Sequence, residues 1–151
     1  MLVAEVPFLH LTVRLEPILH LGQTPYGDRR VIHITGGSFE GPRLSGRIVP
    51  GGADWQILRP DGVADLEARY TLETAAGERV LVRSEGLRHG PADVIAALAR
   101  GEPVDPARYY FRTALRFETA APALAWLNTL IAIGRGIRDP DAVRLDVFEV
   151  L

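Results

Sequence analysis

The sequence predicts an all-β protein with one short helix, folded as an antiparallel β-barrel of about 8–10 strands. Runs rich in β-branched and aromatic residues recur along the chain and are separated by turn residues. Glycine is frequent between positions 36 and 52, where a curved sheet would need kinks or bulges. The segment Val63–Thr74 alternates apolar and polar residues, as a strand with one buried face does. Long strands joined by tight turns favour a barrel or a strongly rolled sandwich.

In the first half of the chain, two turns and one glycine pair separate the expected strands. Pro17 marks a bend or an edge within the first strand, which we expect to be long. Pro25–Asp28 and Arg59–Gly62 have the proline, aspartate and glycine of tight turns, and Gly51-Gly52 separates two strands. The strands expected here are Phe8–Leu21, Arg29–Thr35, Arg43–Val49 and Asp54–Leu58.

The second half predicts the helix and the remaining strands. On one face of Val63–Thr74 lie Ala64, Leu66, Ala68, Tyr70 and Leu72. Pro91 suits the first position of a helix, and Gly101 suits its end. Pro122–Leu127 is expected to form a turn or a short helical piece. The further strands expected are Arg79–Glu85, Tyr109–Glu118, Asn128–Arg138 and Val143–Leu151.

Size and composition restrict the class of protein. We expect one domain spanning residues 1–151, long enough to bury a core without a metal or disulfides. A net charge of −2 disfavours nucleic acid as a partner. The chain has no cysteine and no lysine, which excludes thiol nucleophiles and Schiff-base chemistry. It shows no signal peptide and no apolar run of membrane-spanning length, so we expect a cytoplasmic protein with no membrane partner.

Several runs in the same order resemble the family called domain of unknown function 3237. These runs are Gly36–Gly41, Pro50–Trp55, Ala68–Leu72, Tyr109–Thr113, Arg116–Thr119, Trp126–Asn128 and Leu145–Val150. The resemblance covers almost the whole chain and implies a β-barrel of lipocalin size. It implies no particular activity. Where the family usually has asparagine two residues before the glycine of a strand-ending motif, this chain has Ser84 before Gly86.

Glu40 and Asp54 are the candidate catalytic residues. Both stand among the glycine-rich bends, where two carboxylates could converge on one cavity. Burial and like charge then raise one pKa above the other, which allows one group to act as an acid and the other as a base. Alternatively, each carboxylate accepts hydrogen bonds from the backbone of its own turn.

Arg112 and Glu118 are candidate substrate-binding residues on one expected strand. Their even spacing places them on the same side as Tyr110, Ala114 and Arg116. If this side faces the lumen, the Arg112 guanidinium could bind a substrate carboxylate or enolate. If it faces outward, these residues are solvated charges.

Aromatic residues and one amide complete the candidate binding site. Trp55, Tyr70 and Phe111 could form its walls, with the tyrosine hydroxyl as a donor, or could be plain core residues. Asn128 could orient a carbonyl group or bond a loop backbone. The four histidines lack metal-binding spacing, so we expect no metal site and no cofactor.

Three hypotheses about function remain open at this point. The first is a metal-free acid/base enzyme acting on a small organic metabolite as a lyase, isomerase, hydratase or cyclase. The second is a barrel that binds a metabolite without turning it over. The third is a structural homo-oligomer whose core is filled by its own side chains. A small-molecule ligand and homo-oligomeric assembly are the expected partners.

Overall fold

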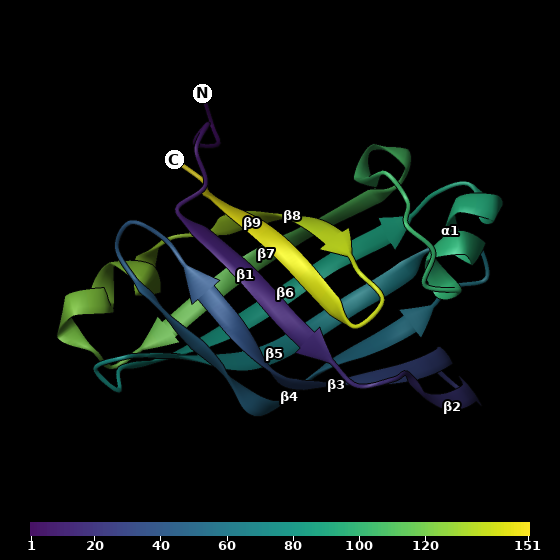
Figure 1. Ribbon diagram of the computed structural model, residues 1–151, viewed down its shortest axis with the longest axis horizontal. Coiled ribbons are helices and arrows are strands. Elements are labelled where there is room, and N and C mark those ends of the chain that lie inside the picture. Colours follow the sequence, from purple (N-terminus) through teal and green to yellow (C-terminus); the bar gives the residue numbers. More distant parts are fainter.

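The computed structural model describes all residues from Met1 to Leu151. Its sheet is antiparallel and contains nine strands, eight of which close into a barrel because β1 pairs with both β9 and β3 (Figure 1). The strands are β1 (Leu9–Leu15), β2 (Leu19–Thr24), β3 (Gly27–Glu40), β4 (Ser45–Leu58), β5 (Ala64–Thr74), β6 (Arg79–His89), β7 (Tyr110–Thr119), β8 (Ala132–Arg138) and β9 (Ala142–Glu149). The predicted fold class is therefore confirmed.

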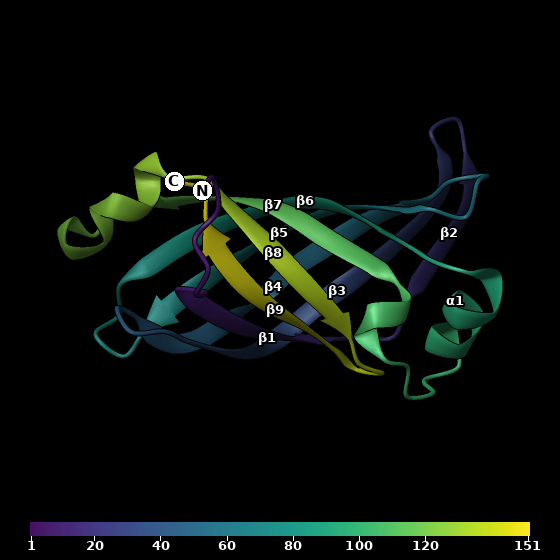
Figure 2. The ribbon, with the colours of Figure 1, turned by 90° about the horizontal axis from the view of Figure 1, so that it is seen from above.

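β2 is the strand outside the closed ring. The expectation of a single strand over Phe8–Leu21 is wrong, because the chain leaves the sheet around Pro17 and returns as β2. β2 pairs with the first part of β3, and β1 pairs with its last part. The β2–β3 hairpin therefore extends past the barrel at one end (Figure 2).

Bulges in β3 and β4 curve the sheet at the glycine-rich stretch. The β3–β4 register shifts between His33 and Ser38, and the β4–β5 register shifts between Val49 and Ala53. The two strands predicted around Gly51-Gly52 are thus one long, bulged strand. A bulge increases local twist and bends the strand, which is what closing a barrel requires.

The helical segments lie at opposite ends of the barrel (Figures 1 and 2). α1 (Ala92–Ala99) occupies the predicted helix and packs its one buried residue, Val94, against the barrel. The predicted strand over Asn128–Arg138 is wrong in its first part, because Pro122–Thr129 forms the 3₁₀ segment η2. A third short segment, η1 (Pro106–Arg108), precedes β7.

Apolar side chains fill the η2 end of the barrel. Leu124 and Leu127 of η2 belong to the main hydrophobic core. Phe8 packs edge-to-face with Phe117 and with Trp126, at centroid distances of 6.1 and 5.8 Å. The Arg43 guanidinium lies 3.6 Å from the centre of the Trp126 ring and covers it. This end is closed, so any site inside the barrel must be reached from the α1 end.

Candidate functional site

A hollow of about 50 Å³ lies inside the barrel, in the half nearer α1. Its volume is several times what one water needs, so it could also hold the small reacting end of a ligand. Apolar side chains such as Ile32, Leu66 and Phe111 form much of its wall. The polar side chains on the wall are Asp54, Gln56, Tyr70, Ser84, Arg88, Thr113 and Arg138.

Asp54 is the one carboxylate on this wall. Its Oδ2 accepts a 2.7 Å hydrogen bond from Gln56 Nε2, and its Oδ1 accepts a 3.1 Å bond from the Glu67 backbone N–H. Arg30 in turn donates to Gln56 Oε1 at 2.8 Å. This chain of donors fixes the orientation of the carboxyl group.

Burial raises the pKa of Asp54 above its ordinary range. The hydrogen bonds from Gln56 and Glu67 and the charges of Arg88 and Arg30 act in the opposite direction, but desolvation is the largest effect. A raised pKa makes a carboxyl a stronger base when it is ionised, which suits proton transfer. Asp54 therefore has the setting of a general acid or base.

Three arginines gather where the hollow opens. Arg88 and Arg138 line the hollow, and both also line the wider chamber outside it together with Arg30. None of the three takes part in any of the ion pairs of the protein. Burial, together with the charges of Arg138 and Arg30, lowers the pKa of Arg88 to about 10. The charges of Asp28, Asp139 and Asp141 also act on Arg30 or Arg138, but none of these carboxylates lines the hollow or the chamber. An anionic ligand could therefore supply the counter-charge at this opening.

Two hydroxyl groups in the lumen lack a hydrogen-bond partner. They are the buried Tyr70 Oη and Thr113 Oγ1, both on the wall of the hollow. Burial raises the pKa of the Tyr70 hydroxyl, so it stays neutral and remains a donor. Buried polar groups are nearly always paired, so these two hydroxyls, which have no partner within the protein, are available to a molecule that enters the hollow.

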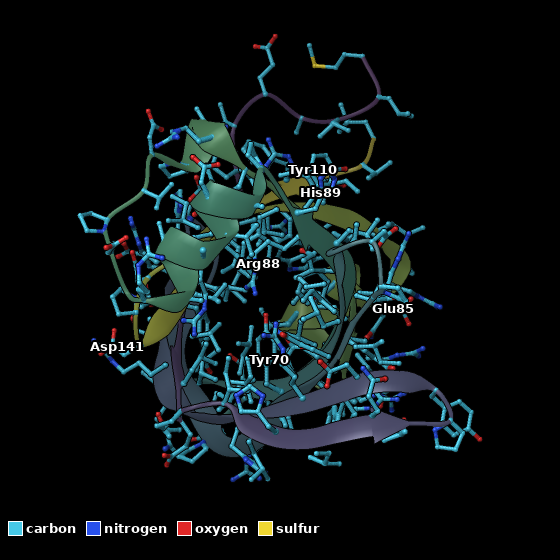
Figure 3. The ribbon with its side chains drawn as sticks, turned by 90° about the vertical axis from the view of Figure 1, so that its right-hand side faces the viewer. Tyr70, Glu85, Arg88, His89, Tyr110 and Asp141 are labelled. Atoms are coloured by element: carbon cyan, nitrogen blue, oxygen red, sulfur yellow. The ribbon has the colours of Figure 1, made fainter.

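Figure 3 looks at the α1 end of the barrel along the lumen. Arg88 and Tyr70 lie on opposite sides of the central opening, and α1 covers part of it. His89 and Tyr110 stack at the rim with ring centroids 4.9 Å apart, outside the hollow (Figure 3). The site is therefore an apolar hollow with a set of polar side chains on its wall, inside a barrel that is open at one end.

The structure does not bring the two predicted catalytic carboxylates together. Glu40 is exposed at the end of β3, where it lies opposite His10 and Ser45, while its neighbour Phe39 points into the core. Inward and outward positions alternate along a strand, so Phe39 and Glu40 cannot both face the lumen. Asp54 stands alone as the carboxylate of the site.

β7 turns its charged side outward. Phe111, Thr113, Leu115 and Phe117 are buried, so Arg112 and Glu118 lie on the outer face. Arg112 lies near the Tyr110 ring and donates to the backbone oxygen of its neighbour Phe111. The prediction that Arg112 and Glu118 share one side is confirmed, but this side faces solvent.

The remaining predicted binding residues divide between wall and exterior. Tyr70 and Phe111 line the hollow, whereas Trp55 lies outside it and is 40% exposed. Asn128 bonds a loop backbone, since its Oδ1 accepts from the Thr119 N–H at 2.8 Å and its Nδ2 donates to the Thr119 carbonyl at 3.0 Å. Of the two roles expected for Asn128, the structure shows the bond to a loop backbone.

Several residues of the site escaped prediction, and some had a signal in the sequence. Ser84 and Arg88 lie on the same side of β6 as the buried Val80 and Val82. The signal in the sequence was a polar residue at a position where the alternation predicts an apolar one. Gln56 follows Asp54 at a spacing of two. The residues missed are Arg30, Gln56, Ser84, Arg88, Thr113 and Arg138.

The structure contains no group of three or more histidine, cysteine, aspartate or glutamate side chains placed to hold a metal ion. His10 instead contacts Asp146 through Nδ1 at 2.7 Å on the outer face, and Arg135 contacts the other oxygen of the same carboxylate. None of the helices has the length and apolar character needed to cross a bilayer.

Comparison with known sequences identifies relatives along nearly the whole chain. A family model described as "Protein of unknown function (DUF3237)" matches residues 4–150. A UPF0311 protein from Rhodopseudomonas palustris is 43% identical over 141 residues, which are 93% of this chain and 92% of that protein.

Solved structures have the same fold. The crystal structure of a conserved protein of unknown function from Rhodopseudomonas palustris has a TM-score of 0.92 and 41% identity, covering 99% of this chain and 97% of that one. A protein from Penicillium herquei, described as an enzyme, has a TM-score of 0.66 at 20% identity, covering 98% of this chain and 97% of that one. At that identity the likeness concerns the fold alone.

Proposed function

Because this chain belongs to the DUF3237 family of proteins of unknown function, we propose its activity from the lumen itself. The protein is an acid/base enzyme that moves a proton on a small organic molecule, with Asp54 as the group that takes and returns the proton. The observation that carries this proposal is a single carboxyl of raised pKa beside unpaired arginines and hydroxyls in one hollow.

The proposed cycle begins with Asp54 in its carboxylate form. It removes a proton from a carbon or oxygen of the substrate, and the electron pair left behind develops negative charge on a substrate oxygen. Arg88, with the Tyr70 and Thr113 hydroxyls, is placed on the same wall to donate to that oxygen. Return of the proton to another carbon gives an isomerisation. Its return to a hydroxyl that leaves as water, while the electron pair forms a double bond, gives an elimination. Where the deprotonated oxygen adds to a conjugated double bond, return of the proton to the carbon at the other end of that bond gives a cyclisation.

A library of small organic acids, incubated with the protein in deuterated water and followed by proton NMR, tests this function. We expect at least one compound to exchange a proton for deuterium or to form a product. Asp54→Asn should lower that rate about 10²–10⁴-fold, the usual contribution of a general acid or base. Glu40→Gln makes the same kind of change on the outer face and should leave the rate unchanged. Equal rates for the two variants would contradict the proposal.

One observation favours a barrel that binds its ligand without turnover. Both oxygens of Asp54 accept hydrogen bonds from the protein. The β4–β5 pairing is interrupted between Asp54 and Ile57, and the Asp54 side chain bonds the Glu67 backbone N–H within this gap. Such a carboxylate can serve as a structural acceptor. Compounds that raise the melting temperature but never exchange a proton would support this second function.

The proposal takes the partner to be a small molecule rather than nucleic acid or a membrane, and takes the protein to be cytoplasmic and homo-oligomeric. The excess of arginine at the opening supports the choice of an anionic metabolite. Sedimentation equilibrium tests the assembly separately, because the lumen is lined by residues of one chain.

A further inference from the structure

We infer that the ligand of this barrel is an amphiphilic organic anion, with its charged head at Arg88 and Arg138 and its apolar body in the chamber beneath α1. This inference deepens the proposed function and rests on the same lumen. It depends on the shape and lining of the space outside the hollow, which the proton-transfer cycle does not use.

The chamber is large enough to hold most of a ligand. Its volume is about 820 Å³, within the usual range of small-molecule sites, whereas the inner hollow has about 50 Å³. Only a small group can therefore pass the arginines and reach Asp54. The greater part of any ligand that engages Asp54 must remain in the chamber.

The chamber has an apolar wall that comes from three parts of the chain. Ile95 and Leu98 of α1 face it, and Leu58 at the end of β4 and Ile18 before β2 complete that side. Leu98 is packed against the small second core, and Ile95 is half-buried. A ligand that covers this apolar surface removes it from water, which favours binding.

The arginines stand at the junction of the two spaces. Arg88 and Arg138 line both, and Arg30 lines the chamber. Arg138 donates to the backbone oxygens of Asp139 and Ala142, which holds its guanidinium in place without neutralising it. The chamber carries one acidic residue, Asp61, and that carboxylate is paired with Arg59. A carboxylate or enolate head can therefore accept charge-assisted hydrogen bonds from these guanidinium groups. A neutral head would be bound more weakly by the same donors.

A series of straight-chain carboxylates from butanoate to decanoate, titrated by calorimetry beside the matching primary alcohols, tests the inference. We expect the affinity to rise about two- to fourfold per added methylene, the upper value corresponding to full burial. Each acid should bind at least tenfold more tightly than its alcohol. An affinity independent of chain length, or equal for acid and alcohol, would overturn it.

Variants separate the two halves of the site. Ile95→Glu should weaken decanoate at least tenfold and butanoate by less than threefold, because only the longer chain reaches α1. Ile131→Glu is the matched control, since this isoleucine is 53% exposed and lies beyond the η2 segment, away from the chamber. Arg88→Met should abolish the preference for acid over alcohol, with Arg88→Gln as the second variant if the first does not fold. Retention of that preference in both would contradict the role of Arg88.

Asp54→Asn distinguishes this inference from the proposed function. If the inference is right, this variant still binds decanoate more tightly than butanoate, even where turnover is lost. Normal turnover of a short, neutral substrate with no gain from chain length would leave the acid/base function standing and refute the amphiphilic ligand.

Discussion

Asp54 is bonded to the backbone of β5 and also lines the hollow. It completes the hydrogen bonding of the β5 backbone through Glu67, and it faces a hollow in which no other carboxylate lies. Its orientation depends on Gln56, which is 2% exposed and is held by Arg30. A preorganised carboxyl of this kind loses little freedom when a substrate arrives, which favours proton transfer.

The raised pKa of Asp54 predicts a particular dependence of stability on pH. An unfolded aspartate loses its proton near pH 4, whereas the buried group keeps it to higher pH. Above that point the folded state binds more protons than the unfolded state, so the contribution of Asp54 to stability falls as the pH rises through its folded pKa. Below the unfolded pKa that contribution is fully present.

Urea unfolding of the protein and of Asp54→Asn at pH values from about 4 to about 8 measures this effect of a single titrating group. The free energy of unfolding of the protein, minus that of the variant, should decrease as the pH rises from about 4. Glu40→Gln is the control, because it makes the same kind of change at an exposed position outside the lumen. A difference that grows with pH would show that the hydrogen bonds outweigh burial.

β8 approaches β7 closely enough to shape the wall of the hollow. A Cβ atom on Gly136 would lie 2.5 Å from Cδ1 of Phe111, and one on Gly134 would overlap the Thr113 hydroxyl. Phe111 and Thr113 both line the hollow. The absence of side chains at these two positions therefore lets an aromatic ring and an unpaired hydroxyl take their places in the lumen.

Gly136→Ala should destabilise the protein by about 1–3 kcal/mol, since the added methyl group overpacks a buried ring. Thermal and urea unfolding measure the change. In a Phe111→Leu background the same substitution should cost less, because the smaller side chain leaves room, and a double-mutant cycle isolates that coupling. An equal cost in both backgrounds would mean that the Phe111 ring is not what the methyl group meets.

Closure of the barrel depends on the meeting of β1 and β3. Gly37 lies opposite Val13 with a φ of +134°, and a Cβ there would overlap the Thr12 carbonyl oxygen. Both the backbone conformation and the close approach therefore require glycine. The closed ring leaves the α1 end as the route of access to the lumen.

Gly37→Ala should destabilise the whole molecule by about 3 kcal/mol or more, because backbone strain and overpacking coincide. Gly51→Ala is the control, since Gly51 has a φ of +115° but no atom within 4 Å of a Cβ, so it carries the strain alone. Hydrogen exchange should show faster opening at β1 and β3 in Gly37→Ala only. Equal losses in the two variants would contradict the importance of the β1–β3 contact.

Much of the fold could be predicted from local patterns. The alternation along Val63–Thr74 put Leu66 and Tyr70 on one face, which the structure buries, and the Arg59–Gly62 turn and the α1 helix also occur where expected. These features depend on neighbouring residues and on period-two geometry alone. Pattern alone could not show which side of β7 faces inward, because both of its sides carry aromatic residues: Tyr110 on one and Phe111 and Phe117 on the other.

The sequence by itself determined that this chain forms bent, antiparallel strands, and it marked Asp54 and Tyr70 as candidates for a polar site without deciding which way they face. Only the tertiary structure decided that Glu40 and Arg112 face solvent and that Arg30, Arg88 and Arg138 meet at one opening. These arginines come from β3, β6 and β8, far apart in the sequence. The physical reason is that bulges reset the inward and outward alternation and barrel closure joins distant strand ends, which no local pattern encodes.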